Sequence, residues 1–199
     1  MEGRGVSESN ALMKPYRTIW DTETKPDSWR DTILIQLNKP GKDKTDLNGK
    51  RHIHTKEEVP KYFGHMVASA VKPILLEGMS PLQIGGIEGH RAEEHLFTIK
   101  SFLLLVEKKK EAIGFQLLDL SKMFDKESLL DCLNEVHKSN VKGKLHKLLY
   151  EMNKDTRITV RTAVGDSDKR LTGENMAQGS FEGAIISSVA LATGTSDFF

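Results

Sequence analysis

Apolar residues recur at two spacings along the chain, and each spacing predicts a different element. Residues 33–37 form an apolar, β-branched run, a turn follows at Pro40-Gly41, and residues 51–55 alternate between the two faces of a strand. This pattern predicts a hairpin with a basic tip. Residues 156–164 alternate in the same way, and the turn "GDSD" leads into "KRLTG", so we expect a second hairpin.

Helical spacing accounts for most of the remaining chain. A helix beginning at either Thr55, as a capping box, or Pro60 is predicted to end at Pro73. Further helices are predicted at 91–107, 126–138, 141–152 and through Ala192, with a strand at 113–118. Because helices and strands interleave while the strands include hairpins, the predicted fold is α+β, with packed helices and a mixed or antiparallel sheet.

Composition limits the class of protein. The 199 residues suffice for one core, and residues 1–28 lack any period, so we expect a poorly ordered lead-in followed by one domain over 29–199. No apolar run approaches the ~18 residues of a membrane span, and no signal peptide opens the chain. With Cys132 as the only cysteine, we expect a reducing, intracellular location in cytoplasm or nucleus, and a buried thiol without chemistry.

The net charge of +1 conceals a local basic surplus. Between Lys138 and Arg170 there are nine Lys or Arg residues and four acidic residues. Such a surplus either faces phosphates or forms a solvated surface, and the count alone does not choose between them.

Two aspartates six positions apart are the strongest candidates for chemistry. Asp119 follows the predicted strand 113–118, where a carboxylate is costly unless it is exposed or binds a cation. Asp125 precedes "KESLL" and is either a helix N-cap or part of the same site. A zinc protease is not expected, because His90 and His95 are five residues apart and zinc-binding imidazoles on one helix face need a spacing of four.

Several motifs together resemble reverse transcriptases of the non-LTR retroelement type. "DLSKMFD" at 119–125 resembles the first aspartate motif of the palm, and "NMAQGS" at 175–180 resembles the second, centred on a Gln-Gly pair. The hairpin at 33–53 is similar to that of the fingers, and 82–96 to the segment joining fingers to palm. The likeness covers about residues 27–195.

The resemblance implies RNA-directed DNA polymerisation, in which two metal ions about 4 Å apart promote nucleotidyl transfer. The cofactor would be Mg²⁺ or Mn²⁺, and the partners an RNA or DNA template-primer and dNTPs. By resemblance Asp119 and the carbonyl of Leu120 bind metal, and Phe124 excludes a ribose 2′-OH. The other implied substrate contacts are Gln178 and Gly179 at the nucleotide, and Arg51 and Lys39 at phosphates. Alternatively, Phe124 is a buried side chain that anchors the core. Gln178 and Gly179 could equally form a turn before the last helix.

The sequence also departs from that family. Met123 and Asn175 stand where the family prefers small residues, and "FEGA" replaces its Pro-containing run. No Asp-Asp pair, the family's third palm motif, occurs in the chain. Because one carboxylate cannot hold two divalent ions, we expect fingers and a partial palm, truncated after the second motif and inactive alone. The alternatives are a non-catalytic nucleic-acid-binding module or a degenerate retroelement remnant, and the oligomeric state is left open.

Overall fold

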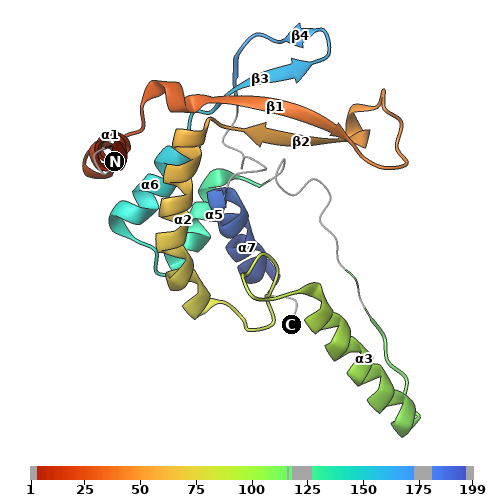
Figure 1. The fold of residues 1–199 in the computed structure, drawn as a ribbon. Helices are drawn as coiled ribbons and strands as arrows, with labels where there is room; N and C mark the ends of the chain where they lie inside the picture. The colour runs from red at the N-terminus through yellow and green to blue at the C-terminus, as the bar shows by residue number, and fades with distance from the viewer. Residues whose placement is uncertain (1–3, 116, 118–126, 173–180, 196–199) are drawn as a thin grey trace.

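The computed structural model describes residues 4–115, 117, 127–172 and 181–195 (Figure 1). Its α-helices are α1 (Arg4–Thr22), α2 (Glu58–Gly78), α3 (Ala92–Lys109), α5 (Leu129–Lys138), α6 (Gly143–Asn153) and α7 (Phe181–Thr195). Its strands are β1 (Asp31–Asn38), β2 (Lys50–Thr55), β3 (Arg157–Thr162), β4 (Gly165–Asp166) and β5 (Arg170–Leu171). Two short 3-10 helices, η1 (Asp27–Arg30) and η2 (Leu47–Gly49), precede β1 and β2.

The strands form one mixed sheet in the order β2-β1-β3-β4, and β5 also pairs with β3. Strands β1 and β2 are antiparallel, with Leu34 opposite His54, whereas β1 and β3 are parallel, with Leu34 opposite Val160. The remaining pairs, β3 with β4 and β3 with β5, are antiparallel. The first predicted hairpin and the α+β class with a mixed sheet are confirmed. The second hairpin is confirmed in the pairing of β3 with β5, but Gly165 and Asp166 of its predicted turn form strand β4.

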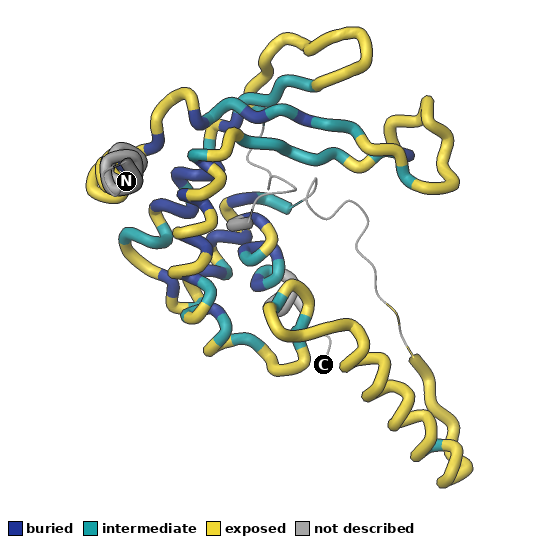
Figure 2. Tube along the Cα trace, viewed as in Figure 1, coloured by how far each residue is buried: buried dark blue, intermediate teal, exposed yellow. Residues whose placement is uncertain are grey.

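The hydrophobic core lies among the helices, below the sheet in Figure 1. Helix α2 contributes Phe63, Val71 and Leu75 to a core shared with α6 and α7, and α5 packs against α6 and α7 in turn. Figure 2 shows this concentration of buried positions in the helical body, whereas the strands are mostly intermediate or exposed. The buried core cluster contains no residue of the described strands. The sheet is therefore available as a surface more than as a core layer.

The first residues differ from the predicted lead-in. Helix α1 spans Arg4–Thr22 and buries Tyr16 and Ile19, whose spacing of three places them on one face. The Tyr16 ring lies 5.5 Å from that of Phe63, and its hydroxyl donates to the carbonyl of Val59 at 3.0 Å. Ordered structure thus begins well before the predicted start near Trp29.

Two predicted elements have different limits. Helix α2 begins at Glu58 with Glu57 as its N-cap residue, so neither Thr55 nor Pro60 begins it. It also continues past Pro73 to Gly78, because Leu75 beyond the proline is fully buried in the core. The predicted strand at 113–118 is wrong in its described part, since residues 113–115 and 117 belong to no strand. An apolar run forms a strand only where a neighbouring strand offers hydrogen bonds to its backbone, and a sequence pattern does not show whether such a strand is present.

Candidate nucleic-acid interface

The β1–β2 hairpin holds the two site residues that the structure describes, Lys39 and Arg51. The loop between the strands is closed by hydrogen bonds from the Lys39 amide to the carbonyl of Gly49, at 2.8 Å, and from the Lys42 amide to the carbonyl of Lys39, at 3.3 Å. Gly41 adopts a φ of +72°, which glycine tolerates without strain. The predicted Pro-Gly turn therefore forms part of an organised loop.

Short-range hydrogen bonds fix the rest of this loop. The Asp43 carboxylate accepts from the amide and hydroxyl of Thr45, at 2.9 and 2.8 Å, and these bonds lower the pKa of Asp43. The Asp46 carboxylate accepts from the Asn48 amide at 2.8 Å and caps η2. A Cβ atom on Gly49 would lie 2.7 Å from the Asp43 carbonyl oxygen, so this position needs glycine for close packing.

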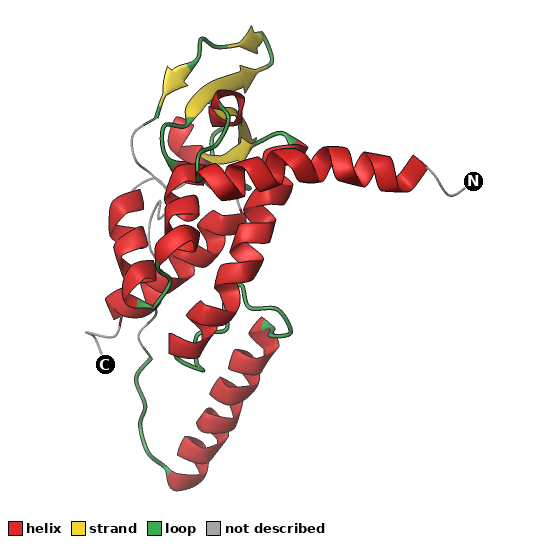
Figure 3. Ribbon diagram, turned by 90° about the vertical axis from the view of Figure 1, so that its left-hand side faces the viewer, coloured by secondary structure: helices red, strands yellow, loops and turns green. Residues whose placement is uncertain are grey.

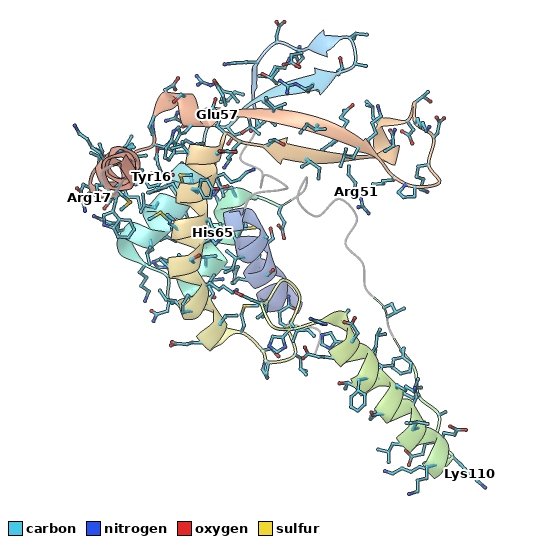
Figure 4. All side chains as sticks on the ribbon, viewed as in Figure 1. Tyr16, Arg17, Arg51, Glu57, His65 and Lys110 are labelled. Atoms are coloured by element: carbon cyan, nitrogen blue, oxygen red, sulfur yellow. The ribbon has the colours of Figure 1, made fainter. Side chains whose placement is uncertain are left out.

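Arg51 is exposed on β2, opposite Leu37 of β1. Figure 4 shows it on the outer part of the hairpin, far from the labelled residues of the helical body such as Tyr16 and His65. Lys39 begins the loop, and its ammonium group donates to the carbonyl of Asn48 at 3.3 Å. The two predicted phosphate contacts therefore lie on the same hairpin.

The hairpin segment from residue 39 to residue 51 is basic, with five cations and two carboxylates. Its charged residues are Lys39, Lys42, Lys44, Lys50, Arg51, Asp43 and Asp46. No ion pair within the described part of the chain involves any of these five cations. A surface cation without an ion pair can meet a phosphate without first losing a carboxylate partner.

The basic segment between Lys138 and Arg170 is arranged differently. Six of its nine cations form ion pairs: Lys138 with Glu135, Lys147 with Glu23, Lys154 with Glu151, Arg157 with Asp27 and Asp31, Arg161 with Asp166, and Lys169 with Asp31. Hydrogen bonds from Lys169 and Arg157 lower the pKa of Asp31. Because many of the carboxylates lie outside the segment, its local surplus is largely neutralised in the fold.

All six candidate residues of the palm motifs fall outside the described residues. These are Asp119, Leu120, Phe124, Asp125, Gln178 and Gly179. The structure nevertheless tests whether Asp125 is the N-cap of the helix that follows it. Helix α5 begins at Leu129, and the hydroxyl of its N-cap residue Ser128 accepts from the Asp131 amide at 3.4 Å. The prediction that Asp125 caps this helix is therefore wrong, since the helix begins later than the apolar spacing suggested.

Cys132 is buried in helix α5, as its neighbours predicted. Burial, more than the nearby Glu127 carboxylate, raises the pKa of this thiol to about 12. A thiol that stays protonated at neutral pH is a poor nucleophile. Within the described ranges, no group of three His, Cys, Asp or Glu side chains could hold a metal ion, and no helix is long and apolar enough to span a membrane.

Sequence reasoning missed a buried cation at Lys25. This side chain is only 3% exposed, and its ammonium group donates to the carbonyls of Lys154, at 2.6 Å, and Met152, at 3.3 Å. Its backbone amide donates to the Glu151 carboxylate at 3.3 Å. Burial above all lowers the pKa of Lys25 to about 7. No local pattern around this residue signals burial, because the contacts come from more than 120 positions along the chain.

Comparison with known proteins supports a reverse-transcriptase-like relationship. No family model matches the sequence. The chain is 23% identical over 182 residues to a Drosophila melanogaster protein described as "Probable RNA-directed DNA polymerase from transposon BS". The alignment covers 89% of this chain and 20% of that protein, so the chain spans about a fifth of its relative's length.

Proposed function

We propose that this chain forms the fingers and part of the palm of a reverse-transcriptase-like polymerase, in which the β1–β2 hairpin binds the phosphates of a nucleic acid. The observation that carries the proposal is the set of hairpin cations with no ion pair in the described chain, at the place where Arg51 and Lys39 were expected to meet phosphate. The similarity to a transposon polymerase along most of the chain supports the same assignment.

The chemistry of the hairpin suits a polyanion. Arg51 offers a planar group that can donate two parallel hydrogen bonds to one phosphate. Lys39, Lys42 and Lys44 lie along the loop and add point charges next to it. Because the loop shape is held by backbone hydrogen bonds, little ordering is needed when a ligand binds.

The proposal assigns the palm roles to residues outside the described ranges. Asp119 and the Leu120 carbonyl would bind Mg²⁺ or Mn²⁺, since these hard ions prefer oxygen ligands. Phe124 would exclude a ribose 2′-OH, and Gln178 and Gly179 would line the dNTP pocket. A two-metal site needs more carboxylates than this donor set provides, and the chain contains no Asp-Asp pair. We therefore propose that this chain alone does not polymerise.

Binding to a fluorescent RNA–DNA primer-template tests the hairpin. Replacing Lys39 and Arg51 together by Ala should weaken binding about tenfold. The slope of log Kd against log salt concentration should fall by about the value expected for one to two phosphate contacts. The matched control replaces Lys138 and Arg161 by Ala, which removes the same charge from ion-paired positions. Equal losses in the two double variants would contradict the proposal, since net charge alone would then explain binding.

Primer extension on a poly(rA) template with dNTPs and Mg²⁺ or Mn²⁺ tests the palm assignment. We expect no extension by this chain or by its Asp119→Ala variant, because the remaining metal-binding carboxylates are missing. Extension by the chain that disappears in the Asp119→Ala variant would support the metal role of Asp119 and overturn the proposed inactivity.

A non-catalytic nucleic-acid-binding module is the second candidate function. The lack of an Asp-Asp pair favours it, because the hairpin cations can bind phosphates without any metal site. Primer-template binding that is unchanged by Asp119→Ala and by EDTA would support this function over a metal-dependent one.

A further inference from the structure

Two histidine side chains meet between helices α5 and α6. His137 lies in the last turn of α5, and His146 lies in the first turn of α6. Their ring centroids are 5.3 Å apart, and the ring planes cross at 78°. Both helices belong to the packed helical body below the strands, which Figures 1 and 3 show from two sides.

The hydrogen bonds of the two rings leave nitrogen atoms for a further ligand. Nε2 of His146 lies 3.0 Å from the Leu133 carbonyl oxygen, so this nitrogen carries a proton and donates. Nδ1 of His146 therefore has a lone pair when the ring is neutral. The His137 side chain is exposed, and its ring makes no hydrogen bond within the described part of the chain. A backbone carbonyl that accepts from the second ring nitrogen is also a common partner of a metal-binding histidine.

The distance between the rings suits a metal ion held by both. With an imidazole nitrogen about 2.1 Å from Zn²⁺ and a tetrahedral angle between ligands, two ring centroids lie roughly 5 Å apart. The observed separation is 5.3 Å. Because the His137 ring is exposed, it can turn about χ2 at little cost and aim a nitrogen toward Nδ1 of His146. Metal binding therefore calls for a side-chain rotation and not for a closer approach of the two helices.

Four lysines lie close to this pair in the sequence, but the fold engages three of them elsewhere. Their partners are Glu135 for Lys138 at 2.6 Å, Glu23 for Lys147 at 2.6 Å, and the Trp20 ring for Lys144 at 5.4 Å. Only Lys142 has no such partner within the described ranges. The C-terminal end of α5 adds a partial negative charge, which favours a cation beside His137.

We propose that His137 and His146 together bind one divalent metal ion of the zinc class, with water at the remaining coordination positions. Imidazole nitrogen suits Zn²⁺, Ni²⁺ and Cu²⁺, whereas Mg²⁺ and Mn²⁺ prefer oxygen ligands. The pair is therefore chemically distinct from the metal position proposed at Asp119. Two protein ligands are fewer than a structural zinc site uses, so the ion exchanges with solvent. When bound, it links the last turn of α5 to α6.

Calorimetric titration of the full chain with ZnCl₂ in excess Mg²⁺ tests the proposal, because Mg²⁺ occupies oxygen-ligand sites and leaves imidazoles available. We expect one Zn²⁺ per unmodified chain at this site. His137→Gln and His146→Gln should each weaken its binding about tenfold or more, because a single imidazole is a ligand that any exposed histidine offers. His65→Gln is the matched control, since it removes an exposed histidine of α2 that bonds to Ser69.

Thermal melts give a second readout. Zn²⁺ should raise the unfolding temperature of the unmodified chain by more than that of either variant, because the ion binds the folded pair in preference to the unfolded chain. Melts in EDTA should show that both variants are folded, since His137 is exposed and a glutamine amide at 146 can still donate to Leu133. Equal Zn²⁺ affinity in the unmodified chain and the His137→Gln, His146→Gln double variant would overturn the proposal, as would an equal loss in His65→Gln.

Discussion

The β1–β2 hairpin and the segment from Lys138 to Arg170 are both basic, but the fold treats their charges in opposite ways. In the hairpin, no cation has an ion pair within the described chain, whereas in the later segment six of nine do. The later segment has the larger surplus in the sequence, and its Arg157 alone contacts two carboxylates. A count of charges therefore does not identify a phosphate-binding surface, because pairing decides which cations remain available.

Among substitutions compared at neutral pH, the largest expected effect comes from breaking the shape of the hairpin loop. Gly49→Ala would place a Cβ atom 2.7 Å from the Asp43 carbonyl oxygen, so the loop must shift. We expect a loss of about 2 kcal/mol in the free energy of unfolding, together with weaker primer-template binding. Chemical denaturation and fluorescence anisotropy measure the two effects.

Gly78→Ala is the control for this substitution, since a Cβ atom there meets nothing within 4 Å. Its stability and affinity should stay close to those of the unmodified chain. Full primer-template affinity in Gly49→Ala would show that the loop shape is unimportant for the hairpin cations.

Lys25 extends the comparison of the two basic regions, because this cation is buried in the folded protein. Burial lowers its pKa to about 7 in the folded state, whereas an unfolded lysine has a pKa near 10.5. Between pH 7 and 10.5 the unfolded state binds more protons at this residue. The contribution of Lys25 to stability should therefore rise with pH across that window, by up to about 1.4 kcal/mol per unit.

Urea denaturation of the unmodified chain and of Lys25→Met at several pH values measures this contribution. The difference in unfolding free energy between the two proteins should change with pH from 7 to 10.5 in favour of the unmodified chain. A pH-independent difference would mean that Lys25 keeps its ordinary pKa in the folded protein.

The smallest expected effects are those of removing single ion-paired arginines, and they distinguish a pair that joins several elements from a pair that is exposed on the surface. Arg157 donates to Asp31 at 2.7 Å and to the carbonyl of Asp27 at 2.8 Å, and so ties η1 and β1 to β3. We expect Arg157→Ala to lower the unfolding free energy by a small but measurable amount, without changing the salt dependence of primer-template binding. Chemical denaturation and anisotropy titrations test this expectation.

Arg161→Ala removes the same charge four residues later, where the pair with Asp166 is exposed on both sides. The loss of unfolding free energy should be smaller than for Arg157→Ala, because solvent screens such a pair. If Arg157→Ala reduced affinity as much as the hairpin variant, the two basic regions would not differ in function.

The sequence alone determined many of the local elements and the first hairpin, although it missed helix α1. The alternation around Ile35 and Ile53, with a Pro-Gly turn between them, identified β1, β2 and the basic loop correctly. Periodicity likewise located helix α3, whose described limits, Ala92–Lys109, differ from the predicted ones by one or two residues. These features depend on residues near one another in the chain, so their pattern is visible without a structure.

Only the tertiary structure decided which polar groups meet. The pairs of Lys147 with Glu23 and of Arg157 with Asp27 join residues more than 120 positions apart. The burial of Tyr16 and Lys25 in the first thirty residues depends on α2 and α6 in the same way. Periodicity reports the faces of an element but not its partners, so the pairing of charges, and with it the choice of a candidate phosphate site, followed from the fold.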